Sequence, residues 1–370
     1  MVIAHDTECL RAPRTDRFNR ASRLEEPMLR LSVLDQSPIS EGMRPADALH
    51  NSVDLARHTE ALGYHRYWVA EHHGTPMLAC AAPEVLIAAI AAATKSIRVG
   101  SGGVMLPHYS PLKVAETFSI LAALHAGRID LGIGRAPGTD QLTTLALQPD
   151  RRQHAADDFR EHLAELLNLL EDRMPEDHPF RRLAALPGRP ELPEPWLLGS
   201  SSQSAVWAAE LGLPYCFADF INPRGAAIVE DYRGRFADSE REPAPRAAIG
   251  VVAICAETDE EAERLAASHR MAFSLLRQGR LIPVPAVEQG LRYAESRPKR
   301  PSSRRFVLGS PATVRAGIEE AAEEYGVAEV FLLTITHEHD ARRRSYELIA
   351  EEFGLARAGM TAAPAGTRAP

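Results

Sequence analysis

The chain of 370 residues is long enough to bury a large core, either as one big domain or as two ordinary ones. Its apolar and charged fractions are those of a soluble globular protein, and a net charge of −8 without a dense Lys/Arg stripe argues against nucleic-acid binding. Four widely spaced cysteines fit a reducing compartment, and no apolar run reaches the roughly 18 residues of a membrane span. We therefore expect a cytoplasmic protein with no nucleic-acid or membrane partner.

The two ends of the chain differ in composition from the rest. Residues 1–27 are rich in Arg and polar residues and lack the apolar segment of a secretory signal, so we expect a flexible N-terminal arm. Met28 is an alternative start, since the first strand begins directly after it. Residues 356–370 are expected to form a disordered tail. The folded domain is then expected to span 29–355.

Strand and helix patterns alternate through this domain without interruption. The strands are expected at 29–36, 65–72, 97–106, 128–136, 194–200, 213–220, 247–257 and 327–336. Helices are expected at 46–62, 83–94, 111–125, 152–171, 205–211, 226–236 and 340–353, with one more beginning at Pro311 after the N-cap Ser310. Residues 272–305 contain several Pro and Arg residues and little periodicity, which indicates a long, lid-like insertion before the eighth strand.

Eight strands alternating with helices predict the α/β class and a (β/α)8 TIM barrel with an insertion before strand eight. The rival architecture is an open doubly wound sheet, in which the first strand usually leads into a Gly-x-Gly-x-x-Gly turn. Here the first strand leads into Asp35-Gln36-Ser37-Pro38, so the barrel is favoured.

Active sites of such barrels lie at the C-terminal ends of the strands. The side chains and backbone expected at that end are Asp35, Gln36, Ser37, Glu71, His72, His73, Gly102, Gly103, Met105, His108, Arg135, Gly199, Ser200, Ser201, Ser202, Asp219, Thr336 and His337.

Three of these groups carry a chemical interpretation. Adjacent glycines inside a strand, Gly102-Gly103, indicate either a tight barrel corner or a bulge where a flat ligand approaches the backbone. The segment LLGSSSQSA (197–205) brings hydroxyls and free N–H groups to a helix N-terminus, which suits a phosphate, although N-capping accounts for one serine. Arg135 offers a fixed positive charge, either for that phosphate or for a structural ion pair.

The stretch Glu71-His72-His73 is consistent with a metal site, a catalytic residue or a polar strand end. Because side chains alternate along a strand, Glu71 and His73 share one side and His72 lies on the other. The three cannot all bind one metal from a regular strand, so a metal site would need other donors, from Asp219, His108 or His337. Metal-dependent barrel hydrolases typically carry His-x-His at the end of strand one, and none is present here.

Over residues 29–355 the chain resembles the bacterial-luciferase-like family of flavin-dependent monooxygenases. The stretches that carry the resemblance, in order and spacing, are RYWVAEHHG (66–74), IRVGSGGVMLPHYSPLKVAE (97–116), GRIDLGIGRAPGTD (127–140) and WLLGSSSQSAVWAAELGLPYCFADFIN (196–222). The resemblance implies a barrel with reduced FMN at its C-terminal mouth, His72 beside the reactive edge of the flavin, and a non-proline cis peptide at Gly102–Gly103 under the ring. The cofactor-binding residues it implies are Gly102, Gly103, Met105, Arg135, Gly199, Ser200, Ser201 and Ser204, with no metal.

Two departures from luciferase itself concern light emission. Its reactive cysteine before the strand-four arginine is Gly134 here, and the glutamate of its phosphate loop is Ser200. Light emission is therefore not implied.

The resemblance implies a two-component monooxygenase of a subgroup with some members in secondary-metabolite pathways. A separate NAD(P)H–flavin reductase supplies reduced FMN, O₂ adds at C4a, and the hydroperoxide oxygenates a small organic substrate. His72 is expected to hydrogen-bond or exchange a proton there with a near-neutral pKa, while Glu71 and His73 hold the strand end. F420-dependent hydride transfer, a metal-dependent hydrolase and a non-catalytic flavin-binding subunit are the alternatives. Relatives commonly pair through helices two and three, so the apolar helix 83–94 predicts a homodimer.

Overall fold

The computed structural model describes residues 29–136, 138–147, 158–185, 191–239, 241–296 and 305–355. The expected N-terminal arm, the C-terminal tail and the first turns of the helix expected at 152–171 lie outside these residues. In the described part of the chain, no helix combines the length and the apolar character that crossing a membrane requires.

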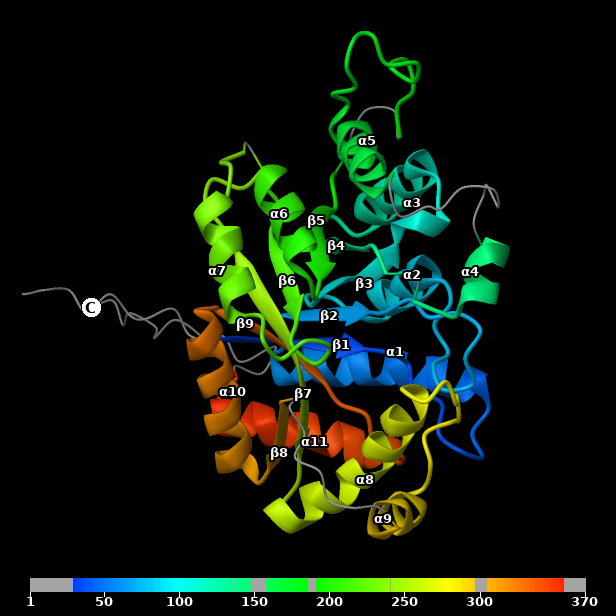
Figure 1. The fold of residues 1–370 in the computed structure, drawn as a ribbon, viewed down its shortest axis with the longest axis vertical. Helices are drawn as coiled ribbons and strands as arrows, with labels where there is room; N and C mark the ends of the chain where they lie inside the picture. The colour runs from blue at the N-terminus through cyan, green and yellow to red at the C-terminus, as the bar shows by residue number, and fades with distance from the viewer. Residues whose placement is uncertain are drawn as a thin grey trace, which may run out of the picture.

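Nine parallel strands form the sheet, and eight of them close into a barrel (Figure 1). The strands are β1 (Arg30–Asp35), β2 (Arg66–Val69), β3 (Arg98–Met105), β4 (Ile129–Gly134), β5 (Glu194–Gly199), β6 (Tyr215–Ala218), β7 (Ala247–Cys255), β8 (Phe306–Gly309) and β9 (Glu329–Leu333). The ring runs in order from β1 to β7 and is completed by β9, which pairs with both β7 and β1. The predicted TIM-barrel fold is thereby confirmed.

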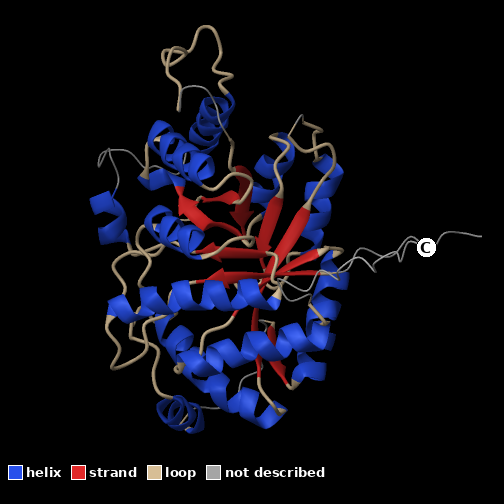
Figure 2. Ribbon diagram, turned by 180° about the vertical axis from the view of Figure 1, so that it is seen from behind, coloured by secondary structure: helices blue, strands red, loops and turns tan. Residues whose placement is uncertain are grey.

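Helices surround this ring on the outside, as Figure 2 shows from behind. They are α1 (Pro45–Leu62), α2 (Pro83–Ala93), the short 3-10 helix η1 (Leu106–His108), α3 (Pro111–Leu124), α4 (Gln141–Leu147), α5 (Phe159–Glu171), α6 (Ser202–Glu210), α7 (Ala226–Arg235), α8 (Asp259–Leu276), α9 (Val287–Glu295), α10 (Pro311–Tyr325) and α11 (His339–Phe353). Four of them begin with proline at the first turn, where its missing N–H costs nothing, and α1, α10 and α11 end at a glycine with positive φ.

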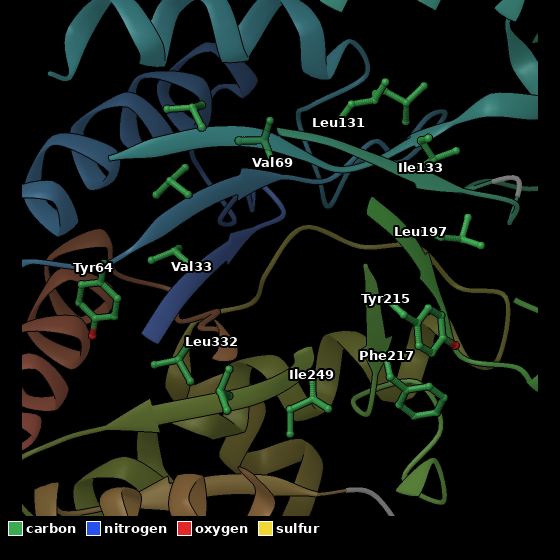
Figure 3. Close-up of a cluster of buried hydrophobic side chains, with 14 of the residues drawn as sticks. Val33, Tyr64, Val69, Leu131, Ile133, Leu197, Tyr215, Phe217, Ile249 and Leu332 are labelled. Atoms are coloured by element: carbon green, nitrogen blue, oxygen red, sulfur yellow. The ribbon is translucent and has the colours of Figure 1, made fainter. Parts of the chain in front are cut away.

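Alternate residues along the strands build two separate layers of core. Side chains such as Val33, Val69 and Ile249 point outward and pack against the helices (Figure 3). The intervening positions point inward, where Trp68 stacks on Phe331 with ring centroids 4.0 Å apart and meets Trp196 edge-on. These aromatic rings fill the barrel interior, so functional groups collect at its two ends.

The segment between β7 and β9 differs in part from the sequence-based expectation. The insertion expected at 272–305 is present, but it contains the last turn of α8 and the helix α9. Neither α8 as a whole nor the strand β8, which follows the insertion, was predicted. Strand β8 pairs with residues 252–255 of β7 and lies outside the ring. The expected eighth strand is β9, and the short helix α4, which follows β4, was not anticipated.

Candidate functional site

One buried carboxylate fastens the C-terminal ends of β2 and β3 together. The Glu71 side chain, which is fully buried, accepts hydrogen bonds from the Met105 backbone N–H (2.9 Å) and the Tyr109 hydroxyl (3.0 Å). Its Oε1 lies 2.6 Å from Nε2 of His73, so Glu71 and His73 share a side, as strand alternation predicts. The His73 ring in turn meets the His108 ring edge-on at 5.8 Å. The expected anchoring role of Glu71 and His73 agrees with this geometry.

The imidazole of His72 points the other way, into a pocket. Its backbone N–H donates to the Cys80 carbonyl oxygen (2.9 Å), while its ring atom Nδ1 is buried and has no hydrogen-bond partner. Burial, followed by the proximity of His73, lowers the pKa of His72 to about 4. The expected near-neutral pKa is therefore wrong, because a buried imidazolium with no carboxylate beside it is disfavoured. At neutral pH His72 is a neutral hydrogen-bonding group.

The pocket at the mouth has a volume of about 430 Å³ and is lined by segments from four parts of the barrel. Gln36 follows β1, His72 and His73 follow β2, and Phe273 and Leu276 come from the end of α8. The remaining lining residues are Thr75, Met77, Leu78, Gly138, Thr139, Asp140, Gly279 and Leu281. Gln36 is only 5% exposed, and its Oε1 atom has no hydrogen-bond partner. Two polar groups are thus buried around one pocket with open hydrogen-bonding capacity.

The neighbours of Gln36 on β1 have structural roles. Asp35 is fully buried and accepts hydrogen bonds from Arg342, from the Tyr67 hydroxyl (2.5 Å) and from the Ser37 backbone N–H (2.6 Å). Burial raises the pKa of Asp35, but Arg342 and the hydrogen bonds outweigh it, so the pKa lies below its usual value. Asp35 is therefore a buried ion-pair partner, and it is not among the residues that line the pocket.

The glycine pair at the end of β3 leaves bare backbone at the mouth. The Gly102–Gly103 peptide bond is cis, as the resemblance implied, and the pairing with β4 shifts register between Gly102 and Val104. A Cβ on Gly102 would lie 2.5 Å from Leu34 Cδ1, and one on Gly103 would lie 2.7 Å from the Gly132 carbonyl oxygen. The corner is tight, and the register shift marks a bulge; the approach of a flat ligand to this backbone stays a prediction.

The N-terminus of α6 forms a second open region, beside Arg135. The Ser201 hydroxyl is the N-cap and accepts a hydrogen bond from the Ser204 backbone N–H (3.4 Å), as the capping interpretation predicts. Ser204 is buried, and its hydroxyl donates to the Ser201 carbonyl oxygen (2.8 Å) and lies 3.0 Å from the Tyr215 hydroxyl. Arg135 is exposed, with its guanidinium 5.3 Å from the centroid of Trp207 in α6. The four serines thus differ: Ser204 faces the protein, whereas Ser200, Ser201 and Ser202 are at least partly exposed.

The other candidates from the strand ends lie apart from the pocket lining. Asp219 accepts a hydrogen bond from the Tyr325 hydroxyl (2.7 Å) and lies 3.6 Å from Arg305, and burial raises its pKa. His337 Nδ1 lies 3.1 Å from the Val284 carbonyl oxygen, and the Thr336 hydroxyl donates to the Glu338 carbonyl oxygen (2.7 Å). Within the described ranges, no three His, Cys, Asp or Glu side chains are grouped so as to hold a metal ion.

Sequence reasoning missed the pocket wall that α8 contributes. Phe273 and Leu276 lie in a segment interpreted as an irregular insertion, and no local signal reveals which face of α8 covers the mouth. It also missed residues 138–140, where the Thr139 hydroxyl donates to the His73 carbonyl oxygen (2.8 Å). The stretch GRAPGTD, already noted for Arg135, was the available signal for this second wall.

Comparisons with known proteins agree with this arrangement. The model of the family described as "Luciferase-like monooxygenase" matches residues 29–329. A luciferase-like monooxygenase of Escherichia coli strain K12 is 39% identical over 88% of this chain and 97% of its own length. An N-acetyl-S-alkylcysteine monooxygenase of Bacillus subtilis is 40% identical over 88% of this chain and 98% of its own. The crystal structure of apo-MsnO8 is 41% identical and superposes with a TM-score of 0.83 over 89% of this chain and 100% of that one.

Solved structures with lower identity show the same fold with two different cofactors. A diketocamphane monooxygenase component in complex with FMN is 21% identical, with a TM-score of 0.66 over 88% of this chain and 98% of that one. An F420-dependent secondary alcohol dehydrogenase in complex with an F420–acetone adduct is 15% identical, with a TM-score of 0.66 over 90% and 100%. The family match, the closed parallel barrel and the relatives of 39–41% identity lead to one conclusion: this chain belongs to the luciferase-like monooxygenase family.

Proposed function

We propose that the chain is an FMN-dependent monooxygenase that uses reduced flavin and O₂ to oxygenate a small organic substrate. The observation that carries this proposal is the buried, unpartnered Nδ1 of His72, a residue that lines the pocket at the C-terminal mouth of the barrel. A neutral imidazole in such a place offers a hydrogen bond to a reacting oxygen atom.

The residues at the mouth fit FMN in two respects. The Gly102–Gly103 pair packs against Leu34 and Gly132, where a Cβ would collide, and it offers backbone without side chains to a flat ring. The N-terminus of α6, with the partly exposed Ser200 and Ser201 and with Arg135 alongside, supplies the donors and the positive charge that a phosphate needs. Gly199 is assigned to this cradle by its position directly before Ser200, and it packs against Ser204, whose hydroxyl a Cβ there would overlap. We assign the isoalloxazine to the glycine pair and Met105, and the phosphate to α6.

Reduced FMN, when bound, supplies the electrons that activate O₂, and the chain supplies position and a dry environment. His72 would hold the reacting oxygen by a hydrogen bond and would stay neutral while doing so, because its pKa lies near 4. Glu71 fixes the floor of this site, since it joins β2, β3 and the residue after η1. The end of α8 covers the mouth with Phe273 and Leu276, which exclude water from the reacting atoms.

The supply of reduced flavin is assigned to a separate NAD(P)H–flavin reductase. The first strand leads into Asp35-Gln36-Ser37-Pro38 in place of the glycine-rich turn that binds dinucleotides. A homodimer is proposed through α2 and α3, where Val85, Ile120 and Leu124 are 67%, 48% and 69% exposed. Light scattering on the purified chain tests this assembly, and a monomeric mass would contradict it.

The decisive experiment is an anaerobic titration of the protein with reduced FMN and with reduced F420. Binding of reduced FMN is expected; binding of F420 alone would replace monooxygenation by hydride transfer. The FMN-loaded protein is then mixed with a flavin reductase, NADH and ¹⁸O₂, and products are identified by mass spectrometry. N-acetyl-S-alkylcysteines and their uncharged carboxamides are the first compounds to test, because a relative of 40% identity is named for the acids. One ¹⁸O atom in the product is the expected result.

A further inference from the structure

The pocket at the mouth carries information about the substrate, because its polar groups are few and unevenly distributed. Gln36 is 5% exposed, and its Oε1 lacks a hydrogen-bond partner. Folding therefore takes the hydrogen bonds to water away from this amide oxygen and puts no hydrogen bond from the protein in their place. Leaving such an acceptor buried and unpaired is unfavourable. A bound molecule with a hydrogen-bond donor would relieve that cost, and it would be held at Gln36.

The position of Gln36 separates it from the proposed flavin site. It shares its pocket with Met77 and Leu78 on one side and with Phe273 and Leu276 of α8 on the other. Neither the Gly102–Gly103 pair nor the α6 serines line this pocket. His72, to which the proposed function assigns the reacting oxygen, lines the same pocket. Gln36 therefore faces the space in which a substrate would lie against the reacting edge of the flavin.

The walls of the pocket exclude a negatively charged substrate. Among the described residues that line the pocket, none is Lys or Arg. Five of them carry large apolar side chains: Met77, Leu78, Phe273, Leu276 and Leu281. The one lining acid, Asp140, is held as an anion by the backbone N–H groups of Leu142 (2.8 Å) and Thr143 (3.0 Å), which lower its pKa. Arg277 and Arg280 are neighbours in sequence, but both are exposed and neither lines the pocket. A carboxylate would be buried there without a cation and near a like charge.

We propose that this pocket binds an uncharged, largely apolar substrate, and that the Gln36 carboxamide holds the substrate's hydrogen-bond donor. This inference rests on the proposed monooxygenase function and adds a substrate class to it. It also separates this chain from an enzyme whose substrate is bound through a carboxylate, since such an enzyme would place a cation in the pocket wall.

The test uses two probes that differ in charge. N-acetyl-S-benzylcysteine carries a carboxylate, and its primary carboxamide is the uncharged counterpart with an added N–H donor. Binding of each to the protein loaded with oxidised FMN is measured by calorimetry, so no turnover is required. We expect the carboxamide to bind at least about tenfold more tightly than the acid. Tighter or equal binding of the acid, or no binding of the carboxamide, would overturn the proposal.

A variant then assigns the effect to Gln36. Gln36→Leu is expected to weaken carboxamide binding about tenfold, with FMN affinity and unfolding temperature unchanged, because the lost oxygen has no partner within the protein. Gln278→Leu is the matched control: Gln278 is exposed, donates to the Ser274 carbonyl oxygen (2.8 Å) and does not line the pocket. Unchanged carboxamide affinity in Gln36→Leu would contradict the assignment.

The outcome is separable from that of the proposed function. If the protein takes F420 in place of FMN, the same two probes are measured on the F420-loaded protein, and their ratio still decides the charge of the substrate. If FMN binds and the acid is preferred, the flavin assignment stands and the inference fails.

Discussion

The two ends of the barrel treat buried polar groups in opposite ways. At the N-terminal end Arg66 is 2% exposed and lies 2.8 Å from Asp130, 3.1 Å from Glu329 and 3.3 Å from Glu194. At the C-terminal mouth Gln36 and His72 keep a buried atom without any partner. The N-terminal end buries a network of paired charges. The C-terminal mouth also pairs Asp35 with Arg342, but beside its pocket it keeps two neutral side chains with an open hydrogen-bonding position. Stability and function are thereby divided along the barrel axis.

Strand β2 joins the two ends and carries a near-identical histidine at each. His65 and His72 both have a buried ring nitrogen without a hydrogen-bond partner, and the pKa of each is lowered to about 4, mainly by burial. Only His72 lines the pocket. A lowered pKa is therefore no mark of function by itself, and the surroundings decide between the two histidines.

The largest effect is expected from breaking the closed end. Although burial lowers the pKa of Arg66, the carboxylates of Asp130, Glu329 and Glu194 outweigh it and raise the pKa above its usual value. Arg66→Met leaves Glu329 buried without its cation and removes one of the cations of Asp130 and Glu194, which keep Arg98. It should reduce the free energy of unfolding by about 3 kcal/mol. Urea denaturation measures this change in the free energy of unfolding. Arg264→Met, which removes an exposed partner of Glu261 on α8, should cost about 0.5 kcal/mol or less. Equal losses in the two variants would contradict the comparison.

Breaking the open end should affect the reaction and leave the fold intact. His72→Ala is expected to lower the rate of ¹⁸O-labelled product formation about 100-fold, because the hydrogen bond to the reacting oxygen is lost. His65→Ala, the matched control on the same strand, should retain product formation within about twofold. Full activity in His72→Ala, or an equal loss in both variants, would sink the assignment of His72.

Acidification should act on both ends alike. A pKa near 4 lies below the 6.5 of the unfolded chain, so between these values the unfolded state binds more protons than the folded state. Stability therefore falls as the pH drops from about 6.5 towards about 4, on the order of 2 kcal/mol for each histidine. His65→Gln and His72→Gln should each flatten the dependence of the unfolding free energy on pH. If the double variant still loses stability steeply between about pH 6.5 and 4, other titrating groups cause the loss.

The smallest effect is expected at the phosphate end of the flavin site. Arg135→Met should weaken FMN affinity about tenfold in a fluorescence titration, since one exposed charge next to the α6 N-terminus is removed. Arg315→Met is the control, because the Arg315 guanidinium also lies 5.3 Å from an aromatic ring, that of Phe353, but on α10. If both variants bind FMN like the unchanged protein, Arg135 has no role in phosphate binding.

Much of the fold could be predicted from the sequence, because most of its strands and helices have clear local sequence signals. RYWV and IDLGIG are short, buried and rich in apolar residues, and Pro83, Pro111 and Pro311 mark helix starts. Strand β8 escaped prediction because four residues, paired only with β7, give too short a pattern. Helix α9 escaped because VEQGLRYAE contains a central glycine and follows a proline-rich stretch.

The site was predictable only where strand ends supply it. The alternation of side chains along a strand could place His72 on the side opposite Glu71 and His73. The same rule explains why Glu71 pairs with His73 and not with His72. The pKa of His72 could not be predicted, since it depends on burial by segments far away in sequence. Gln36 was named among the residues of the first strand end, but its missing partner is a property of the packed molecule.

The wall that α8 contributes to the pocket has a consequence for how specificity diverges. A single stretch of nine residues supplies four of the lining residues: Phe273, Leu276, Gly279 and Leu281. The proposed flavin contacts, in contrast, are spread over β3, β4 and β5 and the segments that follow them. Residues 273–281 therefore form a cassette that can be exchanged between relatives in one piece. Exchange of residues 273–281 alone would then change the substrate pocket and leave the residues assigned to the flavin unchanged.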